Sequence, residues 1–212
     1  MINLLLVVLF FGCFAMLFQQ GIWNNAITLI NVITAGLVAT SLFEPLANRL
    51  ESIEPTYTYL WDFIAVWAAF CLAFIVMRAV TSLLSHFQLR LKQVVNTAGS
   101  AVLAVWISWV MVCFTTMTLH MAPLSRNFLG GSFQPRPDSK MLFGLAPDQR
   151  WLAFVQKVSR GSLATTPPEG VAGEKKANVF DPRGEFIYKY AQRRATFEKQ
   201  LQARVYRGKP AG

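Results

Sequence analysis

The chain opens with a long apolar stretch that contains no charged side chain. Residues 1–43 hold no Lys, Arg, Asp or Glu. A single helix of that length would measure roughly 65 Å, about twice the hydrocarbon thickness of a bilayer. Polar residues interrupt the stretch at Gln19-Gln20-Gly21 and again at Asn24-Asn25, where such a run should fold back. The pattern therefore predicts two membrane-spanning helices, at residues 2–18 and 22–43, joined by a very short turn.

Two later apolar runs, residues 60–77 and 97–119, also have the length and composition of membrane spans. We expect Glu44-Pro45 to end the second helix, because proline cannot continue the hydrogen-bond ladder. The amphipathic residues 78–95 predict a helix that leaves the membrane and lies along its surface. The sequence thus predicts an all-α polytopic membrane domain with four spans over residues 1–122.

Small and polar residues recur at helical spacing on one face of three predicted spans. They are Asn24, Thr28, Asn31, Ala35 and Ala39 in the second span, Ala65, Ala69 and Ala73 in the third, and Ser100, Ala104 and Ser108 in the fourth. Such faces let helix backbones approach closely, and an interhelical hydrogen bond there contributes about 0.6 kcal/mol. We therefore expect helix-packing faces, with the fourth-span stripe complementing the third-span alanines. The alternative interpretation is that Asn24, Thr28 and Asn31 line a path for a small solute.

Asp62 is the acidic residue closest to a predicted span. Ionisable groups in membranes are functional candidates, so a proton-relay role is one interpretation. Its position in the first turn favours an interfacial cap, because the helix dipole favours a carboxylate there.

The sequence predicts no catalytic, cofactor or metal site. The three cysteines fall inside apolar runs and suit the interfaces between helices. His120 has no nearby Cys, Asp or Glu ligand, and His86 is expected to be an interfacial side chain without a catalytic partner. A nucleophile, a base and an orienting group do not occur together in any motif, so an enzyme is the least expected class.

Charge divides the chain in two. The net charge is +9, yet residues 1–122 hold four basic and four acidic residues, so residues 123–212 carry sixteen Lys or Arg against seven Asp or Glu. Overall only 15% of residues are charged, against roughly 25% in ordinary soluble domains. Residues 123–212 therefore read as a basic extramembrane tail.

Two helices are expected in this tail. Pro147-Asp148 opens one at residues 147–160, and Asp181 with Pro182 opens the other, at residues 181–207, as N-cap and first helical position. Their expected interaction residues are Trp151, Val155, Phe186, Tyr190, Arg193, Arg194, Phe197 and Leu201. The tail is too small to bury these stripes itself, so we expect them to contact an envelope protein, a second copy of the chain, or membrane lipid. Nucleic acid ranks last, since no nucleic-acid-binding module is recognisable.

Loop charge predicts the orientation. The connection between the third and fourth spans carries Arg78, Arg90 and Lys92, whereas the preceding one carries only Arg49 as a basic residue. The positive-inside rule places the more basic connection in the cytoplasm, and both termini and the tail outside it.

Several segments of the membrane domain resemble the CvpA family, named for colicin V production. They are Gly21 after the first turn, Ala35-Gly36-Leu37-Val38-Ala39, Phe43-Glu44-Pro45-Leu46-Ala47, the third span with its amphipathic extension, and Gly99 at the start of the fourth. The chain differs from the family pattern at Gln20, where members often carry a basic residue, and at Asn96, where they tend to carry aspartate. The resemblance covers roughly residues 1–122. It implies a four-helix inner-membrane protein linked to colicin V export or production and to envelope homeostasis.

Related four-helix domains anchor periplasmic serine proteases, but this tail contains no histidine and is far too short for such a domain. We therefore expect a non-enzymatic scaffold in the bacterial inner membrane, which self-associates or organises envelope partners through its tail. The alternative is a channel or accessory transport subunit that uses the Asn24/Thr28/Asn31 face and Asp62.

Overall fold

The computed structural model describes residues 2–84, 92–124, 141–160, 180–181 and 183–207, with only the backbone described for Thr56 and residues 201–207. The described residues form helices and no strands, which confirms the all-helical class. The elements are α1 (Ile2–Phe18), α2 (Ile22–Ile53), the short 3-10 helix η1 (Pro55–Tyr57), α3 (Thr58–Leu84), α4 (Gln93–Met121), α5 (Pro147–Arg160) and α6 (Phe186–Arg207).

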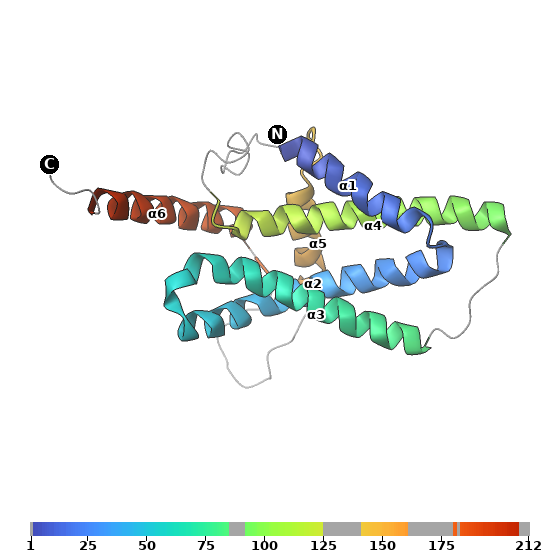
Figure 1. Ribbon diagram of the computed structural model, residues 1–212, viewed down its shortest axis with the longest axis horizontal. Coiled ribbons are helices and arrows are strands. Elements are labelled where there is room, and N and C mark those ends of the chain that lie inside the picture. The colour runs from blue at the N-terminus through green and yellow to red at the C-terminus, as the bar shows by residue number, and fades with distance from the viewer. Residues whose placement is uncertain (1, 85–91, 125–140, 161–179, 182, 208–212) are drawn as a thin grey trace.

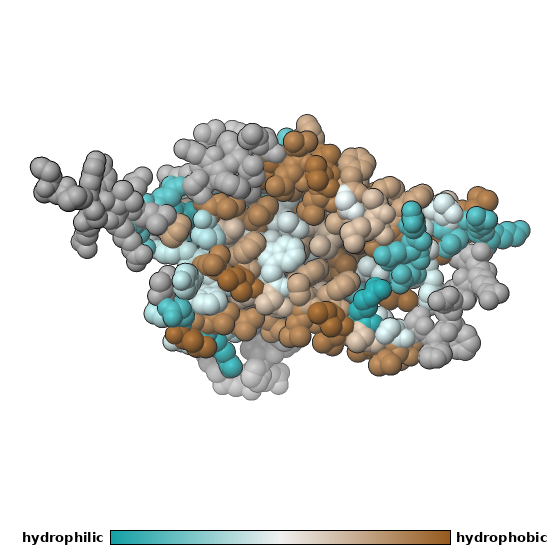
Figure 2. Space-filling view, in the orientation of Figure 1, coloured by the Kyte–Doolittle hydropathy of each residue, from teal (hydrophilic) through white to brown (hydrophobic). Residues whose placement is uncertain are grey.

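Three helices, α2, α3 and α4, are long and apolar enough to cross a membrane, and α1 is a shorter apolar helix of 17 residues. Figure 1 shows these four lying along the long axis of the molecule, with α1 beside α4 and α2 beside α3. Many of their outward side chains are large and apolar, including Leu4, Leu72 and Trp106. In Figure 2 apolar residues cover much of the middle of the visible face, and hydrophilic residues gather toward its ends. This distribution is typical of a membrane-spanning bundle.

The helices form two antiparallel pairs. Ser100, near the start of α4, donates its hydroxyl hydrogen to the carbonyl oxygen of Phe18 at the end of α1. Val112 packs with Ile2 and Leu6 at the other end of this pair. Among the four apolar helices, α4 packs most extensively against α1 and α2, and it meets α3 over a smaller region that includes the stacked rings of Phe70 and Phe114. The expectation that the fourth-span stripe complements the third-span alanines is therefore wrong for Ser100, because the α1–α2 turn occupies that side of α4.

Proline at position 45 does not end α2, contrary to expectation. The helix continues to Ile53, because Ala47 and Leu50 beyond the proline pack into the core with Phe43. Pro45 has no N–H group to donate to the carbonyl oxygen of Ser41, four residues earlier. Both residues lie on the exposed face of α2. The packing gained by the last eight residues outweighs the one missing ladder bond.

Two other boundaries differ from those expected. The predicted surface helix over residues 78–95 is divided: α3 runs without a break to Leu84, α4 begins at Gln93, and residues 85–91 lie outside the described residues. The last tail helix begins at Phe186 rather than Asp181, because Asp181 has a φ of 43° and starts a turn before the helix.

The core includes both tail helices. Its buried side chains come from α2, α3, α4, α5 and α6, and the largest of them are Phe43, Phe70, Phe114, Met117, Met121, Trp151, Phe186 and Tyr190. Figure 1 shows α5 lying across the bundle and α6 extending beyond the end of α4. The tail is therefore a packed part of this structure.

Candidate functional site

The tail meets the membrane helices through polar contacts near the C-terminal end of α4. Two of these contacts use a buried carboxylate: Asp62 forms an ion pair with Arg193, and Asp148 forms a hydrogen bond with the imidazole of His120. We call the first the α6 lock and the second the α5 lock. A buried charge needs a paired and hydrogen-bonded partner, so such contacts fix the geometry of the elements they join.

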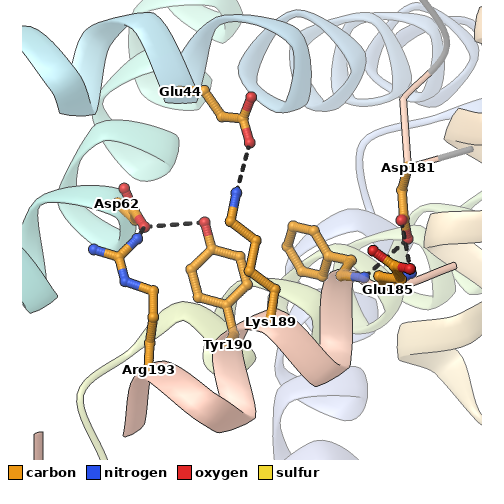
Figure 3. Close-up of polar contacts among 8 residues, drawn as sticks. Glu44, Asp62, Asp181, Glu185, Lys189, Tyr190 and Arg193 are labelled. Atoms are coloured by element: carbon orange, nitrogen blue, oxygen red, sulfur yellow. Dashed lines mark hydrogen bonds and ion pairs between the residues drawn. The ribbon is translucent and has the colours of Figure 1, made fainter. Parts of the chain in front are cut away.

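The α6 lock centres on Asp62, which lies one turn into α3 and is only 7% exposed. Its Oδ2 accepts hydrogen bonds from the Tyr190 hydroxyl, at 3.0 Å, and from Nη1 of Arg193. The same guanidinium donates from Nη2 to the Thr58 carbonyl oxygen at 3.2 Å. Figure 3 shows Tyr190 and Arg193 reaching Asp62 from successive turns of α6. One carboxylate and one carbonyl of α3 therefore hold two side chains of the tail.

Aromatic rings surround the guanidinium of Arg193. Its Cζ lies 5.9 Å from the centroid of the Tyr59 ring and 5.7 Å from that of Tyr190. One turn further along α6, Phe197 packs against Tyr59 with the ring centroids 4.9 Å apart. Cation–π contacts of this kind add about 0.5–1 kcal/mol when they are partly exposed. They keep α6 seated beside the first turn of α3.

Burial raises the pKa of the Tyr190 hydroxyl well above its usual value, and the neighbouring carboxylate of Asp62 raises it further. Tyr190 therefore stays protonated and acts as a donor throughout the physiological pH range. A weaker contact flanks it, an exposed ion pair between Lys189 and Glu44 at 3.2 Å (Figure 3).

Asp181 positions the start of α6. Its two carboxylate oxygens accept the backbone N–H groups of Glu185, at 2.8 Å, and Phe186, at 3.1 Å (Figure 3). Satisfying these N–H groups stabilises the first turn, as an N-cap does. Phe186, Tyr190 and Arg193 then follow at spacings of four and three, which places them on one face toward the bundle.

The α5 lock joins the end of α4 to the first turn of α5. Nε2 of His120 and Oδ2 of Asp148 are 3.0 Å apart, and neither side chain is more than 5% exposed. Asp148 lies in the first turn of α5, where the helix dipole stabilises a carboxylate. The sequence pattern predicts Asp148 at the start of this helix but not its contact with His120, because the two residues are 28 positions apart.

Trp151 continues this contact into the bundle. Its Nε1 donates to the Thr40 hydroxyl at 3.3 Å, and its ring meets Phe114 edge-on at 5.4 Å. A Cβ placed at Gly36 would come within 2.6 Å of this ring, so only glycine leaves room for it there. Gly36 therefore forms a notch in α2 that the indole of α5 fills.

A third polar cluster lies at the opposite end of the bundle, around the α1–α2 turn. Nδ2 of Asn25 donates to the Leu17 carbonyl oxygen at 3.0 Å and to the Ser100 hydroxyl at 2.9 Å. Oδ1 of Asn96 accepts the backbone N–H of Ile22 at 3.0 Å. Asn96 of α4 thus caps the first turn of α2, which has no side-chain cap of its own. Asn25 belongs to the polar break that predicts the turn, and the structure adds that its amide joins α2 to both α1 and α4.

The helix-packing residues lie largely within the bundle. Thr28, Asn31, Ala35, Ala39, Ala65, Ala69, Ser100, Ala104 and Ser108 are buried, and Asn24 and Ala73 are partly buried. Asn24 donates to Gln20 at 3.0 Å, and Asn31 donates to the Thr81 hydroxyl on α3 at 3.0 Å. Within the described residues, Oδ1 of Asn31 has no hydrogen-bond partner. The polar face of α2 therefore meets both α4 and α3.

The tail residues expected to contact a partner instead contact the chain's own helices. Trp151, Val155, Phe186, Tyr190 and Arg194 are buried, while Arg193 and Phe197 are partly buried. The Leu201 side chain lies outside the described part of the chain. The interpretation of Asp62 as an interfacial cap also needs correction, because its carboxylate binds α6 rather than the free N–H groups of its own helix.

The described residues contain no group of three or more His, Cys, Asp or Glu side chains arranged to hold a metal ion. The geometry instead defines a multi-pass, all-helical membrane protein whose tail is held on the bundle by one ion pair, Asp62 with Arg193, and one buried histidine–carboxylate hydrogen bond, His120 with Asp148. The family model described as Colicin V production protein matches residues 2–134, more than half of the chain, and the chain belongs to that family. Comparisons with curated proteins and with solved structures give no match.

Proposed function

We propose that this protein is a scaffold of the bacterial inner membrane that organises envelope partners through its tail. The observation that supports this role most directly is the seating of α5 and α6 on the membrane helices by the α5 and α6 locks. A surface held in this way is preorganised, and preorganisation lowers the entropic cost of binding a partner. The family name, Colicin V production protein, supports a role in making or exporting that toxin.

The proposed docking surface is the outward face of α6. Because Phe186, Tyr190 and Arg194 face the bundle, the opposite side presents Tyr188, Gln192 and Lys199 at spacings of four and seven. Tyr188 is 57% exposed. An exposed aromatic beside polar and basic residues is typical of the residues that dominate binding at protein interfaces. We call Tyr188, Gln192 and Lys199 the outer face of α6.

The test compares matched tyrosine variants in a host whose colicin V production depends on this chain. Tyr188→Ala should reduce colicin V production without changing the amount of protein in the membrane. Tyr57→Ala is the control, because Tyr57 is as exposed as Tyr188 but lies in η1. Lys199→Glu should act in the same direction as Tyr188→Ala. Full production by both tail variants would refute docking through this face.

The runner-up function is transport of a small solute, favoured by the partnerless buried oxygen of Asn31. Asn31→Leu combined with Thr81→Val removes both polar groups with little change in volume. If this double variant abolished production while the outer-face variants retained it, transport would replace scaffolding. Asp62 is unsuitable for that comparison, because its substitution would also release α6.

The extracytoplasmic location of the tail is part of the proposal. It rests on the basic residues Arg78 and Lys92 near the α3–α4 connection. A compartment-sensitive reporter fused after Gly212 tests it, and a cytoplasmic signal would invert the orientation and redirect the search for partners to cytosolic proteins.

A further inference from the structure

The tail contains a second outward surface, which lies close to the expected membrane boundary and is distinct from the outer face of α6. It runs over residues 141–160, the turn before α5 together with α5 itself. We propose that these residues form an interfacial membrane anchor that places apolar side chains among lipid acyl chains and basic side chains at anionic phospholipid headgroups.

The turn before α5 exposes two large apolar side chains. Met141 and Leu142 are buried against α1 and α4, whereas Phe143 is 80% exposed and Leu145 is 45% exposed. The backbone reverses sharply, with φ of 50° at Leu142 and 53° at Phe143. Left-handed conformations at such residues are unfavourable, so the surrounding structure holds the turn in place. The result is a fixed apolar projection.

A hydrogen bond joins this turn to α1. The backbone N–H of Leu142 donates to Oδ1 of Asn3 at 3.1 Å. The outward side chains Leu4 and Leu5 of the same turn of α1 are also exposed. Phe143 and Leu145 therefore extend the apolar surface of an apolar helix, and Figure 2 shows apolar residues gathered over this part of the molecule.

Basic residues accompany the apolar ones along α5. Phe154 is 38% exposed, and Arg150 and Lys157, four residues before it and three after it, are also exposed. Nε of Arg150 donates to the Leu145 carbonyl oxygen at 2.9 Å, which holds this guanidinium beside the turn. Apolar side chains flanked by Lys and Arg are the pattern of helices that lie in a membrane interface.

The depth of α5 agrees with an interface. Trp151 contacts Thr40 on α2 and Phe114 on α4. Thr40 lies 18 residues from Ile22, and Phe114 lies 18 residues from Asn96, which caps Ile22. Eighteen residues span about 27 Å, close to the roughly 30 Å hydrocarbon thickness of a bilayer. If the α1–α2 turn lies at one interface, α5 lies at the other.

The direction of α5 agrees as well. Figure 1 shows α5 lying across α2 and α4 rather than beside them. A helix that crosses membrane-spanning helices lies near the plane of the membrane, as an interfacial helix does. The indole of Trp151 points inward to Gly36, so Phe154 and the turn remain for contact with lipid.

Fluorescent labelling in vesicles tests the anchor. Cys13, Cys71 and Cys113 are replaced by alanine, and single cysteines are introduced as Phe143→Cys, Leu145→Cys and, as the control on α6, Tyr188→Cys. Each full-length variant carries an environment-sensitive fluorophore and is reconstituted into vesicles of equal parts phosphatidylethanolamine and phosphatidylglycerol. We expect a blue-shifted emission at positions 143 and 145, with quenching by lipids brominated on the upper acyl chain. The label at position 188 should be quenched by aqueous iodide instead.

Two outcomes would overturn the anchor. Iodide quenching at positions 143 and 145 as strong as at 188 would place the turn in water. A blue shift without quenching by brominated lipid would show that protein, such as a second copy of the chain, covers the turn.

A separate comparison tests whether the basic side chains of α5 bind anionic headgroups. Arg150→Gln with Lys157→Gln should reduce lipid quenching at position 143 in these vesicles. The same change should have no effect in phosphatidylcholine alone, and equal effects in both lipids would remove the anionic headgroup from the proposal.

Discussion

At the scale of single residues, one contact between the tail and the membrane domain depends on a residue that has no side chain. Gly36 lies in the middle of α2, where glycine costs up to about 1 kcal/mol relative to alanine. The indole of Trp151 occupies the space that a Cβ would fill. The packing of this ring against Phe114 and its hydrogen bond to Thr40 offset that cost. The Ala-Gly-Leu-Val-Ala segment seen in the sequence thus has a physical role in holding the tail.

Gly36→Ala should destabilise the protein by about 1–3 kcal/mol, the usual cost of overpacking, because the new methyl group would force Trp151 out of its notch. The measurement is thermal unfolding in detergent. Gly12→Ala is the matched control, since a Cβ there meets nothing within 4 Å, and it should leave stability unchanged or slightly raised. Equal effects of the two substitutions would show that the indole does not occupy the notch. Adding Trp151→Phe to Gly36→Ala should recover part of the loss.

At the scale of elements, sequence reasoning located most of the helices but not all of their ends. The apolar runs predicted α1 over the residues where it is observed, because a stretch without charge has few other stable structures in a membrane. The ends expected at Pro45 and Asp181 were both wrong, because each was inferred from a local preference of one residue type. Packing of Ala47 and Leu50 into the core extends α2 past the proline, and the turn at Asp181 means that α6 begins only at Phe186.

The contacts that hold the tail could not be predicted from local patterns. Asp62 and Arg193 are 131 positions apart, and nothing near either residue identifies its partner. An amphipathic tail helix has the same pattern whether it covers a membrane domain, a partner or a second copy. The sequence could therefore identify Tyr190 and Arg193 as interaction residues without showing that their target is α3.

The α6 lock should contribute more to tail docking than the neighbouring exposed pair. Asp62→Asn preserves the shape of the side chain but removes the charge that faces Arg193, and we expect a loss of about 2 kcal/mol, typical of a hydrogen bond to a charged group. Faster tryptic cleavage within α6 measures the release. Glu44→Gln makes the same chemical change in the exposed pair with Lys189 and should cost less than about 1 kcal/mol. If Glu44→Gln released α6 as readily as Asp62→Asn, the lock would not be the main docking contact.

At the scale of the whole molecule, the two tail helices differ in how far they enter the bundle. α5 contributes Trp151 and Val155 to the core between α2 and α4, whereas α6 covers the end of the bundle beside the start of α3. The division at residue 122 suggested by charge therefore separates regions of different composition but not independent structural units.

Truncations at two positions should separate these roles. A chain that ends at Arg160 keeps α5 and should remain monodisperse in detergent with a lowered melting temperature. A chain that ends at Ala146 also loses the core residues Trp151 and Val155, and removes Asp148 from the buried His120. We expect this shorter chain to aggregate, as size-exclusion chromatography would show. Equal behaviour of both chains would mean that α5 adds nothing to the core.

The notch at Gly36 has a consequence for the order of synthesis. Thr40, beside the notch, and Trp151, which fills it, are 111 positions apart. At ordinary translation speeds the notch in α2 therefore remains unfilled for roughly 6 to 20 s, the time between synthesis of Thr40 and synthesis of Trp151. The membrane helices therefore enter the bilayer before α5 can pack against them, and α5 and then α6 complete the core afterwards.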